Sequence, residues 1–81
     1  MTITLQWVQV RTGSQDRDGR LVYFGGELAA VLVQLEDEIH GPDRGKWFLE
    51  TGFGSLALHP APLFASLGDA EAWLAVNSTS T

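Results

Sequence analysis

The stretch that decides the fold covers residues 21–38 and reads LVYFGGELAAVLVQLEDE. Its first four residues are a short apolar run, which is typical of a β-strand. Gly25 and Gly26 follow directly. Two glycines between apolar runs favour a tight hairpin, because its turn requires positive φ angles. The sequence therefore predicts that a strand over residues 21–24 turns back at this glycine pair.

The segment after the turn, residues 27–38, can be interpreted in two ways. Four apolar residues recur at helical spacing: Leu28, Leu32, Leu35 and Ile39. Gly41 and Pro42 would end such a helix. Val31 and Val33 are β-branched, however, and three carboxylates in a last helical turn would oppose the helix dipole. We expect a strand that ends in an acidic loop, with a helix as the alternative.

Two further stretches predict strands. Residues 3–10 alternate, with Ile3, Leu5 and Trp7 on one face. Residues 46–51 (KWFLET) form another short run rich in aromatic and apolar residues. Together with the hairpin, these stretches predict an antiparallel sheet.

More specific expectations concern the aromatic residues of these strands and the segment that follows the last strand. Trp47 and Phe48 should face opposite sides of the sheet, and Trp7 could serve either the core or a partner. Residues 55–63 could add a short edge segment, but Pro60 and Pro62 keep it out of the centre of a sheet. We therefore expect four to five strands.

The C-terminal part predicts one helix over residues 67–76. Ser66 is a suitable N-cap, with Asp69 three residues later. The expected core face of the helix consists of Ala70, Trp73, Leu74 and Val76. The fold class is therefore α+β: an antiparallel β-meander of four to five strands with one C-terminal α-helix packed on one face. We expect residues 1–76 to form a single domain and residues 77–81 a flexible polar tail.

Composition excludes several classes of function. Ten Asp and Glu face five Lys and Arg, so the chain of 81 residues has a net charge of −5 and contains no cysteine. This balance disfavours direct binding to nucleic acid or to anionic membranes, because both require a basic surface. The first ten residues lack the features of a signal peptide, so we expect a cytoplasmic protein. We also expect the protein to be a monomer.

No motif predicts an enzyme, a metal site or a cofactor. Residues 16–19 (DRDG) are similar to part of a calcium-binding loop, but the Glu required at its last position is missing. His40 lies near three carboxylates, yet no further ligand points to a metal site, so we expect His40 and His59 to be surface residues. Ser55 follows two glycines without forming the nucleophile motif of hydrolases.

The remaining candidate site is a group of six carboxylates in two predicted loops: Asp16, Asp18, Glu36, Asp37, Glu38 and Asp43. The loops should leave the same end of the sheet, so the six would form one negative rim, which we call the acidic rim. Four basic residues dilute it in part: Arg11, Arg17, Arg20 and Arg44. Carboxylates placed like phosphates would compete for Lys and Arg of a DNA-binding surface, with salt-sensitive association. The other interpretation of the acidic rim is a solubilising surface.

The end of the chain resembles known small domains. Phe64, Ser66, Ala70 and Trp73 match the pattern F-x-S-x-x-x-A-x-x-W that ends many small bacterial and phage sheet-plus-helix domains. Integrase arm-binding domains share this plan and bind DNA through the sheet, but Arg17, Arg20 and Lys46 are too few to line a duplex.

In size, acidity and architecture the chain is also similar to the small inhibitors that phages make against bacterial defences, anti-CRISPR proteins among them. This resemblance implies a non-enzymatic inhibitor that occludes the basic nucleic-acid-binding surface of a partner complex, with the acidic rim as its contact surface. The alternative is a bacterial protein-interaction domain that uses an exposed sheet edge or an aromatic patch.

Overall fold

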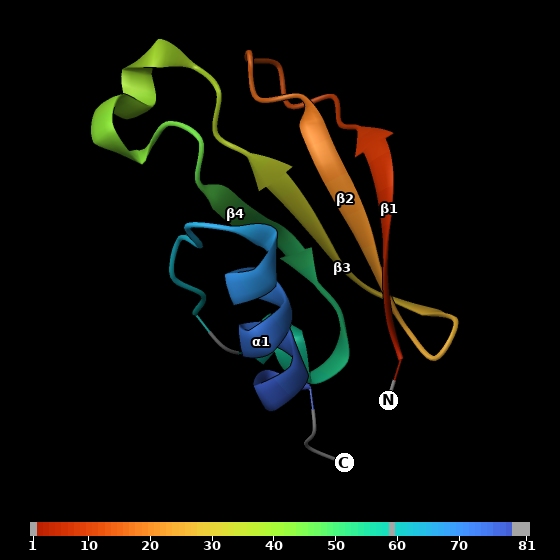
Figure 1. The fold of residues 1–81 in the computed structure, drawn as a ribbon. Coiled ribbons are helices and arrows are strands. Elements are labelled where there is room, and N and C mark those ends of the chain that lie inside the picture. The colour runs from red at the N-terminus through yellow and green to blue at the C-terminus, as the bar shows by residue number, and fades with distance from the viewer. Residues whose placement is uncertain (1, 59, 79–81) are drawn as a thin grey trace.

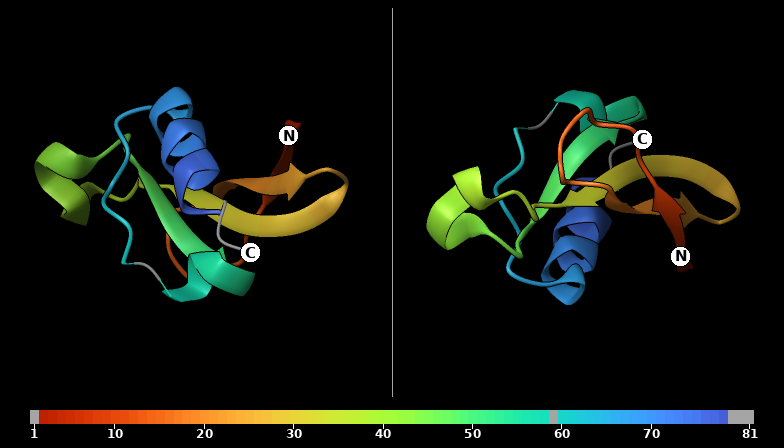
Figure 2. Two further views of the ribbon diagram at one scale, coloured as in Figure 1. Left: turned by 90° about the horizontal axis from the view of Figure 1, so that it is seen from below. Right: turned by 90° about the horizontal axis from the view of Figure 1, so that it is seen from above.

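One four-stranded sheet and one C-terminal helix make up the computed structural model, which describes residues 2–58 and 60–78 (Figure 1). The strands lie in the order β1-β2-β3-β4, and each pairs antiparallel with the next. Their bounds are β1 Ile3–Gln9, β2 Asp18–Phe24, β3 Glu27–Gln34 and β4 Trp47–Gly52. The helix α1 (Leu67–Asn77) covers one face of the sheet (Figure 2). The predicted α+β meander is confirmed.

The glycine pair forms the β2–β3 turn as predicted. Gly25 and Gly26 have φ angles of 57° and 88°, a region that glycine adopts without the steric cost of a side chain. Phe24 and Glu27 are the pair that flanks this turn. The turn therefore sends β3 back along β2.

The segment that begins at Glu27 is a strand, and the helical alternative is wrong. As β3 it pairs with β2 on one side and with β4 on the other. A helix there would leave the facing backbone groups of both neighbours unpaired. The strand ends at Gln34, earlier than expected. Residues 38–43 instead form η1 (Glu38–Asp43), two short 3-10 turns separated by a kink at Gly41, and Asp37 caps the first of them.

The predicted edge segment over residues 55–63 is not a strand. It begins within a second 3-10 helix, η2 (Gly54–Leu58), and among the described residues after η2 an isolated bridge is the only pairing with the sheet. In that bridge, Trp47 and Phe64 exchange backbone hydrogen bonds of 2.7 and 2.9 Å. Pro60 and Pro62 have no N–H groups to donate, which explains why no ladder forms before Phe64.

The helix begins as predicted and extends one residue further. Ser66 Oγ accepts a hydrogen bond of 3.1 Å from the Asp69 N–H group, which confirms the N-cap. Ala70 and Leu74 are fully buried, but Val76 is 72% exposed. Its assignment to the core face was wrong, because two residues after Leu74 a side chain points about 200° around the helix.

The tail expected over residues 77–81 begins later than predicted. Asn77 belongs to α1. Its side-chain amide donates to the Trp73 carbonyl at 2.8 Å, and its backbone carbonyl accepts from Ser55 Oγ at 3.3 Å. Ser78 is the C-cap of α1. The rest of the expected tail, residues 79–81, lies outside the described residues.

The hydrophobic core lies between the sheet and α1. Its buried members are Val22, Ala30, Leu32, Trp47, Leu56, Phe64, Ala70 and Leu74. The rings of Phe64 and Trp73 meet in a tilted arrangement with their centroids 5.7 Å apart, a favourable geometry for aromatic pairs. The core thus joins the sheet, η2 and the helix into a single domain.

The part of the chain that the structure describes contains no helix with the length and hydrophobicity of a membrane span.

Candidate functional site

The two predicted acidic loops do leave the same end of the sheet, as expected. Residues 10–17 connect β1 with β2, and residues 35–46 connect β3 with β4 (upper end of the sheet in Figure 1). Asp16 joins them directly: its Oδ1 accepts hydrogen bonds from the N–H groups of Glu36 and Asp37 at 2.6 and 2.8 Å. The carboxylate of Asp16 therefore holds the two loops together.

Asp16 itself does not lie on an exposed rim. It is only 8% exposed, and its second oxygen, Oδ2, lies 2.6 Å from His40 Nε2. Since an ionised carboxylate can only accept, His40 Nε2 carries the hydrogen. The expectation that Asp16 contacts a partner is therefore wrong, because its two oxygens are already engaged inside the protein. We call this arrangement the Asp16 clamp: Asp16, His40 and the backbone N–H groups of Glu36 and Asp37.

The electrostatics of the clamp favour the ionised carboxylate. Burial raises the pKa of Asp16. Its hydrogen bonds lower the pKa by more than burial raises it, and they come from the Glu36 N–H group, the His40 side chain and the Asp37 N–H group. The net result is a pKa below the ordinary value of 3.8. The segment that begins at Glu36 is thus held by charge-assisted hydrogen bonds, which are stronger than neutral ones.

Two other members of the acidic rim are paired with cations. Asp18 Oδ1 lies 2.8 Å from Arg20 Nη1, and Asp43 Oδ1 lies 2.8 Å from Lys46 Nζ. Such partly exposed pairs add little stability, but they cancel charge locally. Asp18 and Asp43 therefore contribute less negative potential than the sequence alone indicates.

Arg20 also contacts the core. Its guanidinium carbon lies 5.1 Å from the centroid of the Trp47 ring, which is cation–π geometry. Sequence reasoning treated Arg20 only as a surface charge and missed this contact, since Trp47 lies 27 residues further along the chain.

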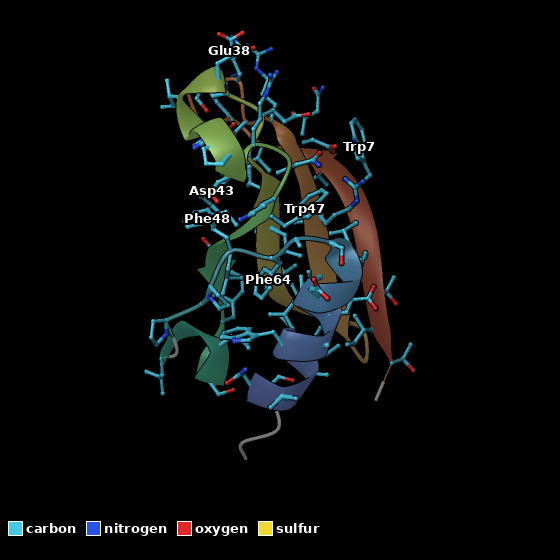
Figure 3. All side chains as sticks on the ribbon, turned by 60° about the vertical axis from the view of Figure 1, so that its left-hand side comes forward. Trp7, Glu38, Asp43, Trp47, Phe48 and Phe64 are labelled. Carbon is cyan, nitrogen blue, oxygen red and sulfur yellow. The ribbon has the colours of Figure 1, made fainter. Side chains whose placement is uncertain are left out.

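The remaining three carboxylates form what we call the acidic segment: Glu36, Asp37 and Glu38. Within the described residues, none of the three forms an ion pair with Lys or Arg. Asp37 Oδ1 accepts from the Ile39 N–H group at 3.2 Å and so caps η1. Glu38 is exposed at the tip of the molecule (Figure 3). The acidic segment lines an open hollow together with Gln15 and Arg44.

The loop end as a whole is close to neutral. All five Lys and Arg residues of the chain lie between Arg11 and Lys46, on the same two loops or on the adjoining start of β2. They oppose the six carboxylates of the acidic rim, which leaves a formal charge of −1 there. The rest of the net charge comes from Glu27, Glu50, Asp69 and Glu71. The negative surplus of the chain is therefore not concentrated at the acidic rim.

His40, expected to be a surface residue, is partly exposed, but the sequence did not predict that it belongs to the Asp16 clamp. No local signal could have shown this, since the two residues are 24 positions apart. His59 lies outside the described residues. Within the described ranges, no three His, Asp or Glu side chains are grouped so that they could hold a metal ion.

The aromatic residues divide between core and surface. Trp47 is buried and the adjacent Phe48 is 42% exposed, which confirms that they face opposite sides of the sheet. Trp7, for which both roles were open, is 58% exposed. Figure 3 shows it on β1, apart from Trp47 and Phe64. An exposed Trp on a strand at the edge of the sheet is a candidate contact residue.

Comparison of the chain with family models, with curated proteins and with solved structures found no match.

Proposed function

We propose that this protein is a non-enzymatic, cytoplasmic inhibitor of the phage anti-CRISPR type. Its acidic segment, Glu36 to Glu38, docks on the basic surface of a nucleic-acid-handling complex and blocks access of DNA. The observation that carries this proposal is the Asp16 clamp, because it holds the backbone of the acidic segment in place. Ordering this loop before binding reduces the entropy lost on association.

Three further features support the acidic segment as the contact. Its carboxylates have no Lys or Arg partner within the described residues, so docking would not first have to break an ion pair. Glu38 lies at the tip of the molecule, where a flat or concave basic surface can reach it (Figure 3). Asp18 and Asp43 already have cationic neighbours, so we assign them a secondary role.

The test compares two triple variants that remove the same number of charges. One is Glu36→Gln, Asp37→Asn and Glu38→Gln, in which the asparagine side chain introduced in place of Asp37 can still cap η1. The control is Glu27→Gln, Glu50→Gln and Asp69→Asn, away from the loop end. Purified RNA-guided surveillance complexes and their target DNA serve as the probe in a gel-shift competition. We expect the first variant to inhibit about tenfold less well, or roughly 0.5 kcal/mol per lost charge, and the control to inhibit as the native chain does.

Salt provides a second measurement on the same samples. Inhibition through the acidic segment should weaken as ionic strength rises, because exposed charges are screened. Equal inhibition by both triple variants, or inhibition that salt does not change, would contradict the proposal.

A second candidate function is an interaction domain that binds another protein through its sheet edge or an aromatic patch. The near-neutral loop end together with the exposed Trp7 and Phe48 favours this candidate. It predicts binding that is insensitive to salt and to the acidic segment, but is reduced by Trp7→Ala or Phe48→Ala.

A further inference from the structure

The free edge of β1 has none of the features with which proteins protect an exposed strand. Ile3–Gln9 reads ITLQWVQ, without a charged residue or a proline. Its pairing with β2 is regular over all seven residues, whereas β2–β3 and β3–β4 each contain a register shift. Within the described chain, no segment pairs with the other side of β1. Regular, uncharged edges of this kind readily pair with another strand.

The register shows which backbone groups face this edge. Val10 donates to the Arg17 carbonyl at 2.8 Å, and Gly25 donates to the Thr2 carbonyl at 3.0 Å. Hydrogen-bonded pairs alternate along an antiparallel ladder, so the even-numbered residues of β1 bond to β2. The odd-numbered residues therefore direct their N–H and C=O groups outward: Ile3, Leu5, Trp7 and Gln9.

We propose that this edge pairs with the same edge of a second copy of the chain, so that the protein forms a dimer and not the monomer expected from the sequence. An antiparallel pairing centred on Gln6 would place Leu5 opposite Trp7 of the second copy, and Ile3 opposite Gln9 of the second copy. All of these are outward-facing residues, so the two edges exchange hydrogen bonds in full register. The two sheets then form one continuous sheet across a twofold axis, in a self-complementary interface.

Side chains and charge both favour a second copy as the occupant. Trp7 is 58% exposed in the single chain, and in the pair it would cover the half-buried Leu5 of the other copy. Because β1 carries no charge, two chains of net charge −5 can meet there without opposing carboxylates. The acidic segment belongs to the β3–β4 loop and not to this edge, so this inference does not depend on the proposed function.

A single cysteine tests the register, because the native chain contains none. At the twofold axis, Gln6 would face Gln6 of the second copy in a non-hydrogen-bonded pair, with Cα atoms about 4.5 Å apart. That separation permits a disulfide. Thr4 is the matched control: it is also exposed and on the same face, but would lie roughly 14 Å from its counterpart.

The experiment measures disulfide formation of Gln6→Cys and Thr4→Cys under mild oxidation on non-reducing gels. We expect Gln6→Cys to cross-link at least about tenfold faster, because pairing raises the local concentration of its thiols. Adding Trp7→Lys should abolish this difference, with circular dichroism confirming that the variant is folded. Equal cross-linking rates for the two cysteine variants would overturn the proposal, and so would the absence of cross-linking. The comparison of the two cysteine variants remains decisive if Trp7→Lys does not fold.

Discussion

At the scale of single residues, Asp16 does the most to organise the loop end. One buried carboxylate accepts two backbone hydrogen bonds from the acidic segment and a third from His40. Its own backbone is held as well, since its N–H group donates to Ser14 Oγ and its carbonyl accepts from Thr12 Oγ1. Asp16 therefore links the first loop to the second and determines how the acidic segment is presented.

The first prediction concerns the stability that Asp16 contributes. Asp16→Ala leaves the Glu36 and Asp37 N–H groups without their acceptor, so we expect the free energy of unfolding to fall by about 2–4 kcal/mol. Urea denaturation measures this change. The matched control is Asp43→Ala, which removes a partly exposed ion pair and should cost less than about 1 kcal/mol. Similar losses in the two variants would contradict the assignment of a structural role to Asp16.

The second prediction is the pH dependence of this contribution. Because the pKa of Asp16 is lower in the folded chain than its ordinary value of 3.8, ionised Asp16 stabilises the fold above that value. This stabilisation is lost as pH falls through 3.8 toward the lower folded pKa. The difference in unfolding free energy between the native chain and Asp16→Ala should therefore shrink from neutral pH into that acidic range. A difference that stays constant with pH would show that the ionised form is not the one that stabilises.

At the scale of the elements, close packing around Gly19 brings the start of β2 near its neighbours. A Cβ atom at Gly19 would lie 2.6 Å from Val10 Cγ2 and 3.0 Å from the Leu32 carbonyl oxygen. The first separation is too short for two carbon atoms, so the Val10 side chain would have to move, and the second would require the Leu32 backbone to shift by a few tenths of an ångström. Gly19 therefore allows both β3 and the chain just after β1 to approach β2 closely.

The third prediction follows from this packing. Gly19→Ala should lower the free energy of unfolding by about 1–3 kcal/mol through overpacking. Gly68→Ala is the control, since a Cβ atom there would lie at an ordinary distance of 3.7 Å from Ser66 Oγ in the first turn of α1. Alanine favours helix, so that variant should be unchanged or more stable by up to about 1 kcal/mol. Thermal or urea unfolding of both variants provides the measurement, and a neutral Gly19→Ala would rule out the close approach.

At the scale of the whole molecule, the positive and the negative charges of the chain are distributed differently. All five cationic residues gather near the acidic rim, while Glu27, Glu50, Asp69 and Glu71 carry negative charge elsewhere. This is why the two triple variants of the proposed function form an informative pair. They have equal net charge, so a difference between them reports the position of the carboxylates and not the overall field of the protein.

The sequence by itself determined the features that depend on near neighbours in the chain. The Gly25-Gly26 turn, the Ser66 cap and the opposite orientations of Trp47 and Phe48 follow from local backbone geometry, and the structure confirms all three. The order of the strands also followed, because consecutive strands of a sheet usually lie side by side. Even the meeting of the two acidic loops could be predicted, since both connect strands at one end of a meander.

Only the tertiary structure decided which carboxylates are available to a partner. Asp16 is buried because the backbone of residues 36–37, some twenty positions away, supplies the hydrogen bonds that offset its desolvation. His40 and Trp47 likewise acquire their polar partners across the fold, from Asp16 and Arg20. Burial and ion pairing depend on distances in space, and a sequence specifies those distances only once the chain has folded.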